Sequence, residues 1–159
     1  MSSLHETHVV TDWDPWFFID PKTRMIVNKR GEPKTLIQYD HNSERMTFEM
    51  PRYIEGHDMS KCNLVEIHYT NVASRGGRTS TGVYEVKDMK YHEYVNDILC
   101  WTWLVDGNAL LNAGNLEFMI RFACMTDEVA DYVWNTADNT EDVIVSGSLA
   151  PSYLAETIE

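Results

Sequence analysis

The sequence predicts an all-β fold, an antiparallel sandwich or barrel of about seven to eight strands. Three observations lead to this prediction. Several short segments alternate apolar and polar residues with a period of two, as in Arg45–Met50 and Asn63–Thr70. Turn-forming residues separate such segments at intervals of about 8 to 12 residues. No segment has the 3.6-residue apolar period of a long amphipathic helix.

The expected strands follow one another along most of the chain. In Arg45–Met50 the apolar side chains fall on one face and the polar side chains on the other, which indicates a half-buried strand. Ile98–Val105 is apolar on both faces, so we expect it to lie centrally. Gly76 and Gly77 predict a hairpin tip. The expected strands of the main body are Thr35–Tyr39, Arg45–Met50, Asn63–Thr70, Val83–Val86, Ile98–Val105, Leu116–Cys124, Tyr132–Trp134 and Val143–Val145. Before them, Trp16–Ile19 and Met25–Val27 are expected to be short extended pieces.

The composition along the chain suggests three parts. We expect an N-terminal arm and edge segment at 1–34, a β-sandwich domain at 35–147 and a C-terminal tail at 148–159. Residues 1–12 are polar and mixed, as in a flexible arm. Pro15 and Pro21 bracket an aromatic stretch and argue against a helix there. For the tail, a short helix and disorder both remain open.

The negative charge of the chain argues against nucleic-acid and membrane partners. Lys and Arg number 13 against 25 Asp and Glu, so the formal net charge is −12. Such a charge repels phosphate backbones and anionic lipids. The N-terminus has neither the basic start nor the apolar core of a signal peptide, and no apolar run reaches transmembrane length. We therefore expect a soluble protein.

The three cysteines, Cys62, Cys100 and Cys124, are widely spaced and odd in number. This pattern does not suggest a disulfide framework, and the absence of a C-x-x-C pair argues against a zinc site. The simplest interpretation is free, buried, reduced thiols, which implies assembly in a reducing cytoplasm.

Several long motifs carry a resemblance to a known group of proteins. The chain resembles structural proteins of phages and prophages of Firmicutes, and is similar to the N-terminal, immunoglobulin-like domain of phage baseplate upper proteins. The resemblance spans about Ile19 to Ser146. The motifs that carry it are Ile19–Arg24 (IDPKTR), Ile37–Arg45 (IQYDHNSER), Phe48–Ser60 (FEMPRYIEGHDMS), Arg121–Cys124 (RFAC) and Tyr132–Ala137 (YVWNTA).

The resemblance implies an Ig-like antiparallel β-sandwich that is made in the bacterial host cytoplasm and located in the virion. It implies contacts with other virion proteins in a baseplate, tail or head appendage, and a homo-oligomer. Many relatives continue into a longer appendage protein, whereas this chain stops soon after the sandwich. We therefore expect attachment or assembly more than receptor binding, with a carbohydrate- or host-receptor-binding module as the alternative.

Two polar motifs have residue types that catalysis or metal binding would use. Asp40-His41-x-x-Glu44 offers three metal ligands close in sequence, but a polar hairpin turn explains it better. His57-Asp58 offers a base and its orienting carboxylate. The two side chains would have to contact each other, and the side chains of adjacent residues rarely form such a pair. We therefore expect no enzyme, no catalytic residue, no metal and no cofactor.

Three tryptophans could form a sugar-stacking platform. Trp101 and Trp103 are two residues apart and share one face of a strand, and Trp134 lies in another expected strand. Core packing is the favoured interpretation. A ligand or interface role remains the alternative.

A second aromatic group lies near the N-terminus, at Trp13, Trp16, Phe17 and Phe18. Four large aromatic rings exposed together would need another surface to bury them. Aromatic clusters also dominate binding hot spots. One hypothesis is therefore that this segment docks to a partner. The equally weighted alternative is that it folds back onto its own sandwich as an edge strand.

Overall fold

The computed structural model describes residues 5–10, 15–87, 89–92 and 97–149, and the fold is an all-β sandwich. The predicted fold class is therefore confirmed. The described residues contain fourteen strands, more than the seven or eight expected, because several are only two to four residues long. In these ranges no helix is long and apolar enough to cross a membrane.

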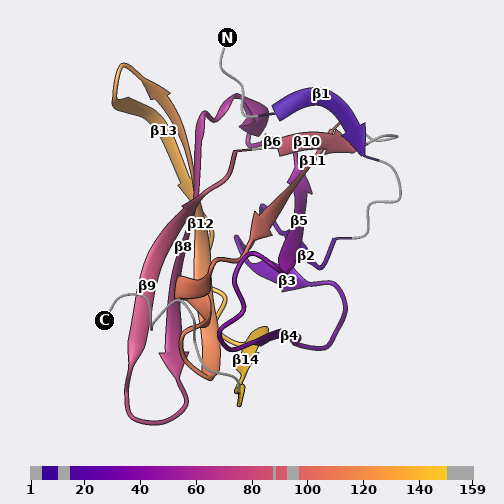
Figure 1. The fold of residues 1–159 in the computed structure, drawn as a ribbon. Helices are drawn as coiled ribbons and strands as arrows, with labels where there is room; N and C mark the ends of the chain where they lie inside the picture. The colour runs from indigo at the N-terminus through magenta and orange to yellow at the C-terminus, as the bar shows by residue number, and fades with distance from the viewer. Residues whose placement is uncertain (1–4, 11–14, 88, 93–96, 150–159) are drawn as a thin grey trace.

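The first sheet has six strands in the order β1-β10-β11-β5-β2-β3 (Figure 1). Its longest strands, β5 and β11, pair antiparallel along their whole length, with Phe48 opposite Trp101. The strands are β1 (His5–Val10), β10 (Met89–His92), β11 (Ile98–Leu104), β5 (Arg45–Pro51), β2 (Phe17–Ile19) and β3 (Ile26–Asn28).

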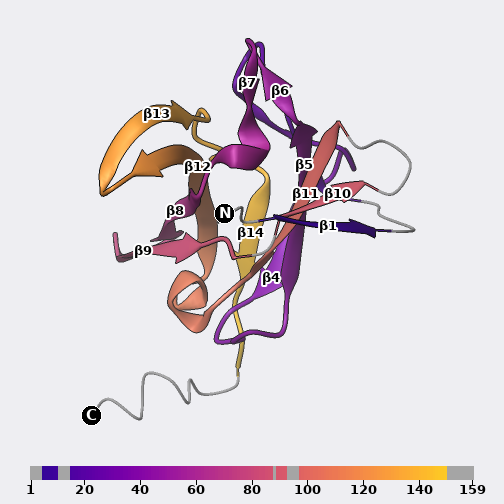
Figure 2. The same cartoon turned by 90° about the horizontal axis from the view of Figure 1, so that it is seen from above.

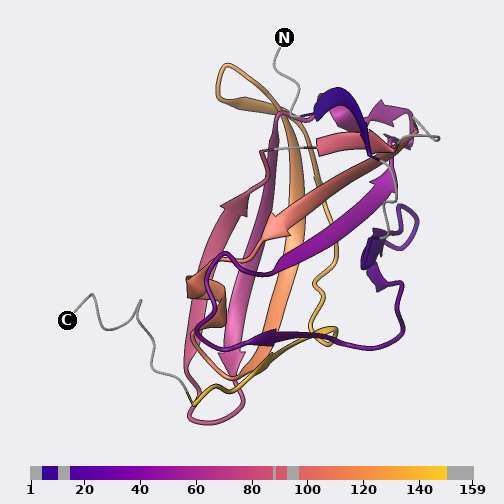
Figure 3. The same cartoon turned by 45° about the vertical axis from the view of Figure 1, so that its right-hand side comes forward.

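The second sheet has the order β4-β14-β12-β8-β9, and β13 also pairs with β12. Figure 2 shows β8, β9, β12 and β13 on one side of the molecule and β1, β5, β10 and β11 on the other. In Figure 3, β5 and β11 cross the long strands of the second sheet obliquely. The strands are β4 (Lys34–Ile37), β14 (Val143–Ser146), β12 (Gly114–Thr126), β8 (Leu64–Ala73), β9 (Thr79–Glu85) and β13 (Val129–Asn135).

Shorter elements close the ends of the sandwich. The hairpin β6 (Tyr53–Ile54) and β7 (His57–Asp58) turns at Glu55 and Gly56, which both have positive φ, as a two-residue hairpin turn requires. Two 3-10 helices follow later strands, η1 (Met59–Lys61) and η2 (Gly107–Leu110). The predicted hairpin tip at Gly76 and Gly77 joins β8 to β9, and both glycines have positive φ.

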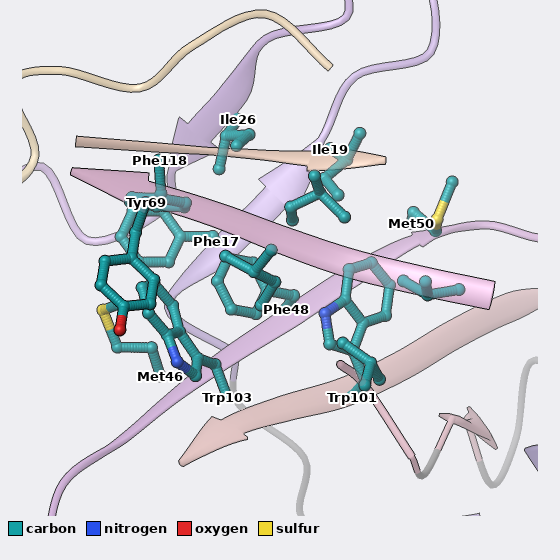
Figure 4. Packing of buried hydrophobic residues seen from close by; sticks show 14 of the residues in the cluster. Phe17, Ile19, Ile26, Met46, Phe48, Met50, Tyr69, Trp101, Trp103 and Phe118 are labelled. Carbon is teal, nitrogen blue, oxygen red and sulfur yellow. The ribbon is translucent and has the colours of Figure 1, made fainter. Parts of the chain in front are cut away.

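An aromatic row across the first sheet forms the centre of the core (Figure 4). Phe48 stacks on Phe17 at 5.3 Å and on Trp101 at 5.6 Å between ring centroids. The second sheet contributes Phe118, which meets Phe17 and Phe48 edge to face. All four rings are buried, so the two sheets are held together largely by apolar burial and ring packing.

Two features differ from the expected outline. Residues 5–10 form β1 and pair with β10, so this part of the predicted flexible arm is a strand. The sandwich is not wholly antiparallel, because β1–β10, β2–β5 and β14–β4 pair in parallel. A parallel pair requires a long connection, so neighbouring segments in sequence could not reveal it.

Candidate interaction surface

The outer face of the second sheet collects exposed aliphatic side chains. Alternate residues of a strand point to opposite sides of the sheet, so the inner residues fill the core and the outer ones meet solvent. Four large aliphatic residues are exposed on this face: Ile37 (41%), Val83 (53%), Val133 (45%) and Ile144 (39%). They come from four strands, β4, β9, β13 and β14. Exposed apolar residues gathered on one face are typical of a surface that contacts another molecule.

A hollow of about 400 Å³ lies in the middle of this face. The pairing register places Val83 of β9 opposite His68 of β8, and His68 opposite Met119 of β12. The adjacent row contains Thr70 and Glu117, which are also direct cross-strand partners. The outward side chains that line the hollow are His68, Thr70, Thr81, Val83, Glu117, Met119 and Asp138. The outward lining of the hollow is thus mostly polar, with Val83 and Met119 as its apolar side chains.

Two carboxylates at the hollow have no ion-pair partner among the described residues. These are Glu117, on the floor strand β12, and Asp138, which follows β13. Elsewhere on the face, Glu66 lies 3.0 Å from His68 and Lys87 lies 3.3 Å from Glu85. Arg121, which does not line the hollow, donates to the side-chain oxygen of Asn135 at 2.9 Å. The unmatched charge of the hollow is therefore negative.

The edge of the sheet beside the hollow is closed over part of its length by η2. Asn108 donates its side-chain N–H groups to the Thr81 carbonyl and to the Tyr69 hydroxyl, both at 2.9 Å. The Ser80 hydroxyl donates to the Asn108 carbonyl at 2.8 Å. These bonds cover the first half of β9 and leave the Val83–Glu85 half as an edge without a neighbouring strand in the second sheet.

The N-terminal aromatic segment belongs mostly to the first sheet. Phe17 is fully buried, and β2 lies between β5 and β3, so this ring is a core residue and is not available for docking. Trp16 is half-buried, packs against the core, and has Arg30 and Lys34 over its ring at 4.5 and 4.7 Å. Phe18 is half-buried and points away from the core.

Phe17 and Trp16 therefore fold back onto the sandwich, as the alternative interpretation of the aromatic segment expects. Trp13 lies outside the described residues. Of the three predicted docking residues that the structure describes, Phe18 is the one whose side chain points outward, where a partner could contact it. Its neighbours on the outer side of the first sheet are Val27 and Glu49.

The three later tryptophans are core residues. Trp101 and Trp134 are 2% exposed, and Trp103 is fully buried. Trp101 packs edge to face against Phe122, and Trp134 is tilted against the same ring. The suggested ligand platform is therefore not formed, because the rings that would stack on a sugar point into the sandwich.

The Asp58 motif is a structural brace. Nε and Nη2 of Arg52 donate to the two oxygens of the Asp58 carboxylate, each at 3.0 Å. The Ser60 hydroxyl donates to the same carboxylate at 2.6 Å. Partial burial would raise the pKa of Asp58, but these hydrogen bonds outweigh burial and hold the pKa at about 2. His57 does not pair with Asp58; its ring stacks on Tyr132 at 3.8 Å. The predicted turn thus describes this motif better than a catalytic pair.

The Asp40–Glu44 motif also takes part in structural contacts. The Gly107 N–H donates to Nδ1 of His41 at 2.8 Å, and the Glu44 carboxylate lies 3.5 Å from Lys34. Within the ranges given above, no group of three or more His, Cys, Asp and Glu side chains converges as a metal site would require.

Comparisons with known proteins include a likeness to a solved structure. No family model matches the chain, and no curated protein matches it. The fold is similar to the N-terminal domain of phage TP901-1 ORF48. The two share 13% sequence identity with a TM-score of 0.44, over 83% of this chain and 97% of that one.

The alternation of residues in β8 indicates the face on which the hollow lies, although no residue motif marks the hollow itself. Glu66, His68 and Thr70 alternate with buried residues in β8, which predicts an outer face but not its shape. The hollow depends on how β9, β8 and β12 are paired and twisted, and on Asp138 reaching the face from the far side of β12.

Proposed function

We propose that the chain is a non-enzymatic structural or adaptor protein of a phage virion, acting through protein–protein contacts. The observation that carries the proposal is the outer face of the second sheet, with a hollow lined by the exposed Val83 and three further exposed aliphatic residues on other strands of the face. The quoted motifs, which resemble phage structural proteins, supply the virion context. The finer assignments, to Firmicutes phages and to the Ig-like N-terminal domain of baseplate upper proteins, depend on those motifs alone.

The proposed occupant of the outer face is a segment of another virion protein with a positively charged side chain beside an apolar one. The cationic group would sit near Glu117 and Asp138, which have no ion-pair partner in the described ranges. The apolar group would cover Val83 and Met119. Charge complementarity of this kind selects partners and sets orientation. We also propose that the virion contains more than one copy of the chain.

The absence of enzymatic activity is part of the proposal. Its support is that the two motifs with catalytic residue types serve as braces, through Arg52–Asp58 and through His41–Gly107. The carbohydrate-binding alternative loses its main support, because the three candidate tryptophans are buried.

Incorporation into particles tests the proposal. Phage particles carrying Val83→Glu should lack the protein, whereas particles carrying Val27→Glu should contain it at the normal level. Val27 is the matched control because it is an exposed strand valine, 40% accessible, on the opposite sheet. Quantitative mass spectrometry of purified particles gives the measurement, and circular dichroism of each purified variant checks folding.

Three results would contradict the proposal. If both variants are incorporated normally, the outer face is not a docking surface. If Val27→Glu alone is excluded, docking occurs on the first sheet beside Phe18 instead. Absence of the unmodified chain from purified particles would contradict the virion assignment itself.

A further inference from the structure

We infer that Cys62 and Cys124 form an intramolecular disulfide when the folded chain meets an oxidising environment. The two side chains are free thiols in the structure, and their Sγ atoms are 3.0 Å apart. A disulfide bond is about 2.05 Å long, so the sulfur atoms must close by only about 1 Å. This inference goes beyond the proposed function and does not depend on it.

The backbone around the pair holds the two cysteines together. The N–H of Asn63 donates to the Ala123 carbonyl at 3.1 Å. The side chain of Asn63 donates to the Met125 carbonyl at 3.0 Å and accepts from the Met125 N–H at 2.8 Å. The residue after Cys62 is thereby tied to both neighbours of Cys124. The proximity of the sulfur atoms follows from these bonds and not from side-chain rotation alone.

The pairing register of β12 changes at the same place. β12 and β13 shift register between Cys124 and Met125, as at a β-bulge. A bulge re-aims the side chains next to it, and here Cys124 shares the inner side with Cys62. On the other side of the pair, the Cys62 N–H donates to the Met59 carbonyl at 3.2 Å, which anchors Cys62 to the end of η1.

The exposure of the two thiols sets the order of reaction. Cys124 is half-buried, so a small oxidant can reach it, whereas Cys62 is fully buried. Burial, together with the neighbouring Cys124, raises the pKa of the Cys62 thiol well above its usual value, which makes it the poorer first nucleophile. Cys124 therefore reacts first and Cys62 resolves the intermediate.

The oxidant is a low-molecular-weight disulfide, RSSR, and the reaction is thiol–disulfide exchange. The Cys124 thiolate attacks one sulfur of RSSR, a mixed disulfide forms, and one RSH leaves after taking up a proton. Cys62 then loses its proton and attacks Sγ of Cys124, which expels the second RSH. The chain loses two protons and two electrons, and one RSSR becomes two RSH.

The third cysteine serves as an internal control. Cys100 is 1% exposed in β11 of the first sheet, and no other cysteine in the described ranges lies beside it. Burial, with the nearby Glu49 carboxylate, raises its pKa to about 12. It should remain a thiol under the conditions that oxidise the pair.

The disulfide would link positions 62 residues apart in sequence. It would therefore lower the conformational entropy of the unfolded chain. In a reducing cytoplasm the thiols stay reduced, and the cross-link forms in an oxidising environment. By loop-entropy scaling, the cross-link should raise the unfolding temperature of a domain of this size by about 8 °C or more.

The test exposes the purified full chain to oxidised glutathione, blocks remaining thiols with iodoacetamide and maps the peptides by mass spectrometry. We expect a Cys62–Cys124 peptide pair, alkylated Cys100, and a rise in Tm that dithiothreitol reverses. Cys100→Ser should keep the rise, and Cys124→Ser should lose it. Glutathione retained on Cys124 without exchange, disulfides between chains, or no oxidation would each overturn the inference. The peptide map of the unmodified chain decides the matter even if a variant fails to fold.

Discussion

Tyr69 of β8 lies over Gly82, its direct cross-strand partner in β9. A Cβ atom placed on Gly82 would come within 2.6 Å of Cζ of Tyr69, so the ring occupies space that only a glycine leaves free. The ring position also matters for bonding, because the Tyr69 hydroxyl donates to Asp106 at 3.2 Å and accepts from Asn108 at 2.9 Å. Gly82 thereby permits the contact between η2 and the edge strand.

The Gly82→Ala substitution should therefore destabilise the protein. We expect a loss of about 1 to 3 kcal/mol in the free energy of unfolding, because overpacking displaces the Tyr69 ring and strains its two hydrogen bonds. Urea denaturation gives the measurement. Thr81→Ala, one residue away with an exposed side chain, is the control and should change stability by less than about 0.5 kcal/mol. Equal effects would mean that the cost reflects strand propensity and not the ring contact.

Asp58 should make stability depend on acid pH. Its folded-state pKa of about 2 lies below the ordinary value of 3.8, so the folded protein holds the charged form more strongly than the unfolded chain does. This contribution is complete above about pH 4 and disappears as the pH falls to about 2. Asp58→Asn should thus cost about 1 to 2 kcal/mol at pH 7, with allowance for solvent screening, and almost nothing at pH 2.

Unfolding curves at pH 2, 3, 4 and 7 would measure this difference between the two proteins. Glu141→Gln is the control, because Glu141 is exposed and makes no ion pair with a described residue. It should leave the free energy of unfolding nearly unchanged at every pH. A cost of Asp58→Asn that persists undiminished at pH 2 would show that packing, and not the charge, is responsible.

Phe17 and Phe18 allow a direct test of the aromatic segment. Phe17→Ala removes a fully buried ring that stacks on Phe48, so we expect a loss of about 3 to 5 kcal/mol. Phe18→Ala removes a half-buried outward ring and should cost about 1 kcal/mol. Thermal unfolding of both variants measures the difference. Comparable losses would contradict the assignment of Phe17 to the core and Phe18 to the outside.

The sequence predicts which face of each main strand is buried, because apolar and polar residues alternate in these strands. Met46, Phe48 and Met50 were placed on one face by period alone, and all three are buried. Trp101 and Trp103 likewise point into the core, as the favoured interpretation expected. Local alternation determines which face is buried, since one residue of slip would expose the whole apolar set.

The alternation within a strand does not identify the distant strand with which it pairs. Phe17 is next to Phe48 because β2 pairs in parallel with β5, and nothing in either segment specifies the other as its partner. Cys62 and Cys124 meet only because Asn63 is bonded to β12 across the sheet. The hollow likewise requires Asp138 to reach the face that carries Glu117, an arrangement that depends on the return of the chain after β13. Each of these contacts depends on topology, which the composition of a single strand does not encode.

The negative hollow gives a prediction that separates charge from folding. Glu117→Lys combined with Asp138→Lys reverses the charge of the two carboxylates that line the hollow, and should prevent incorporation into particles because a cationic partner group would be repelled. Glu32→Lys combined with Glu128→Lys changes the net charge equally at two exposed positions in turns and should be incorporated normally. Mass spectrometry of purified particles compares the two, with circular dichroism to verify that both are folded. If both pairs are excluded, total charge governs assembly; if neither is, the carboxylates of the hollow do not contact the partner.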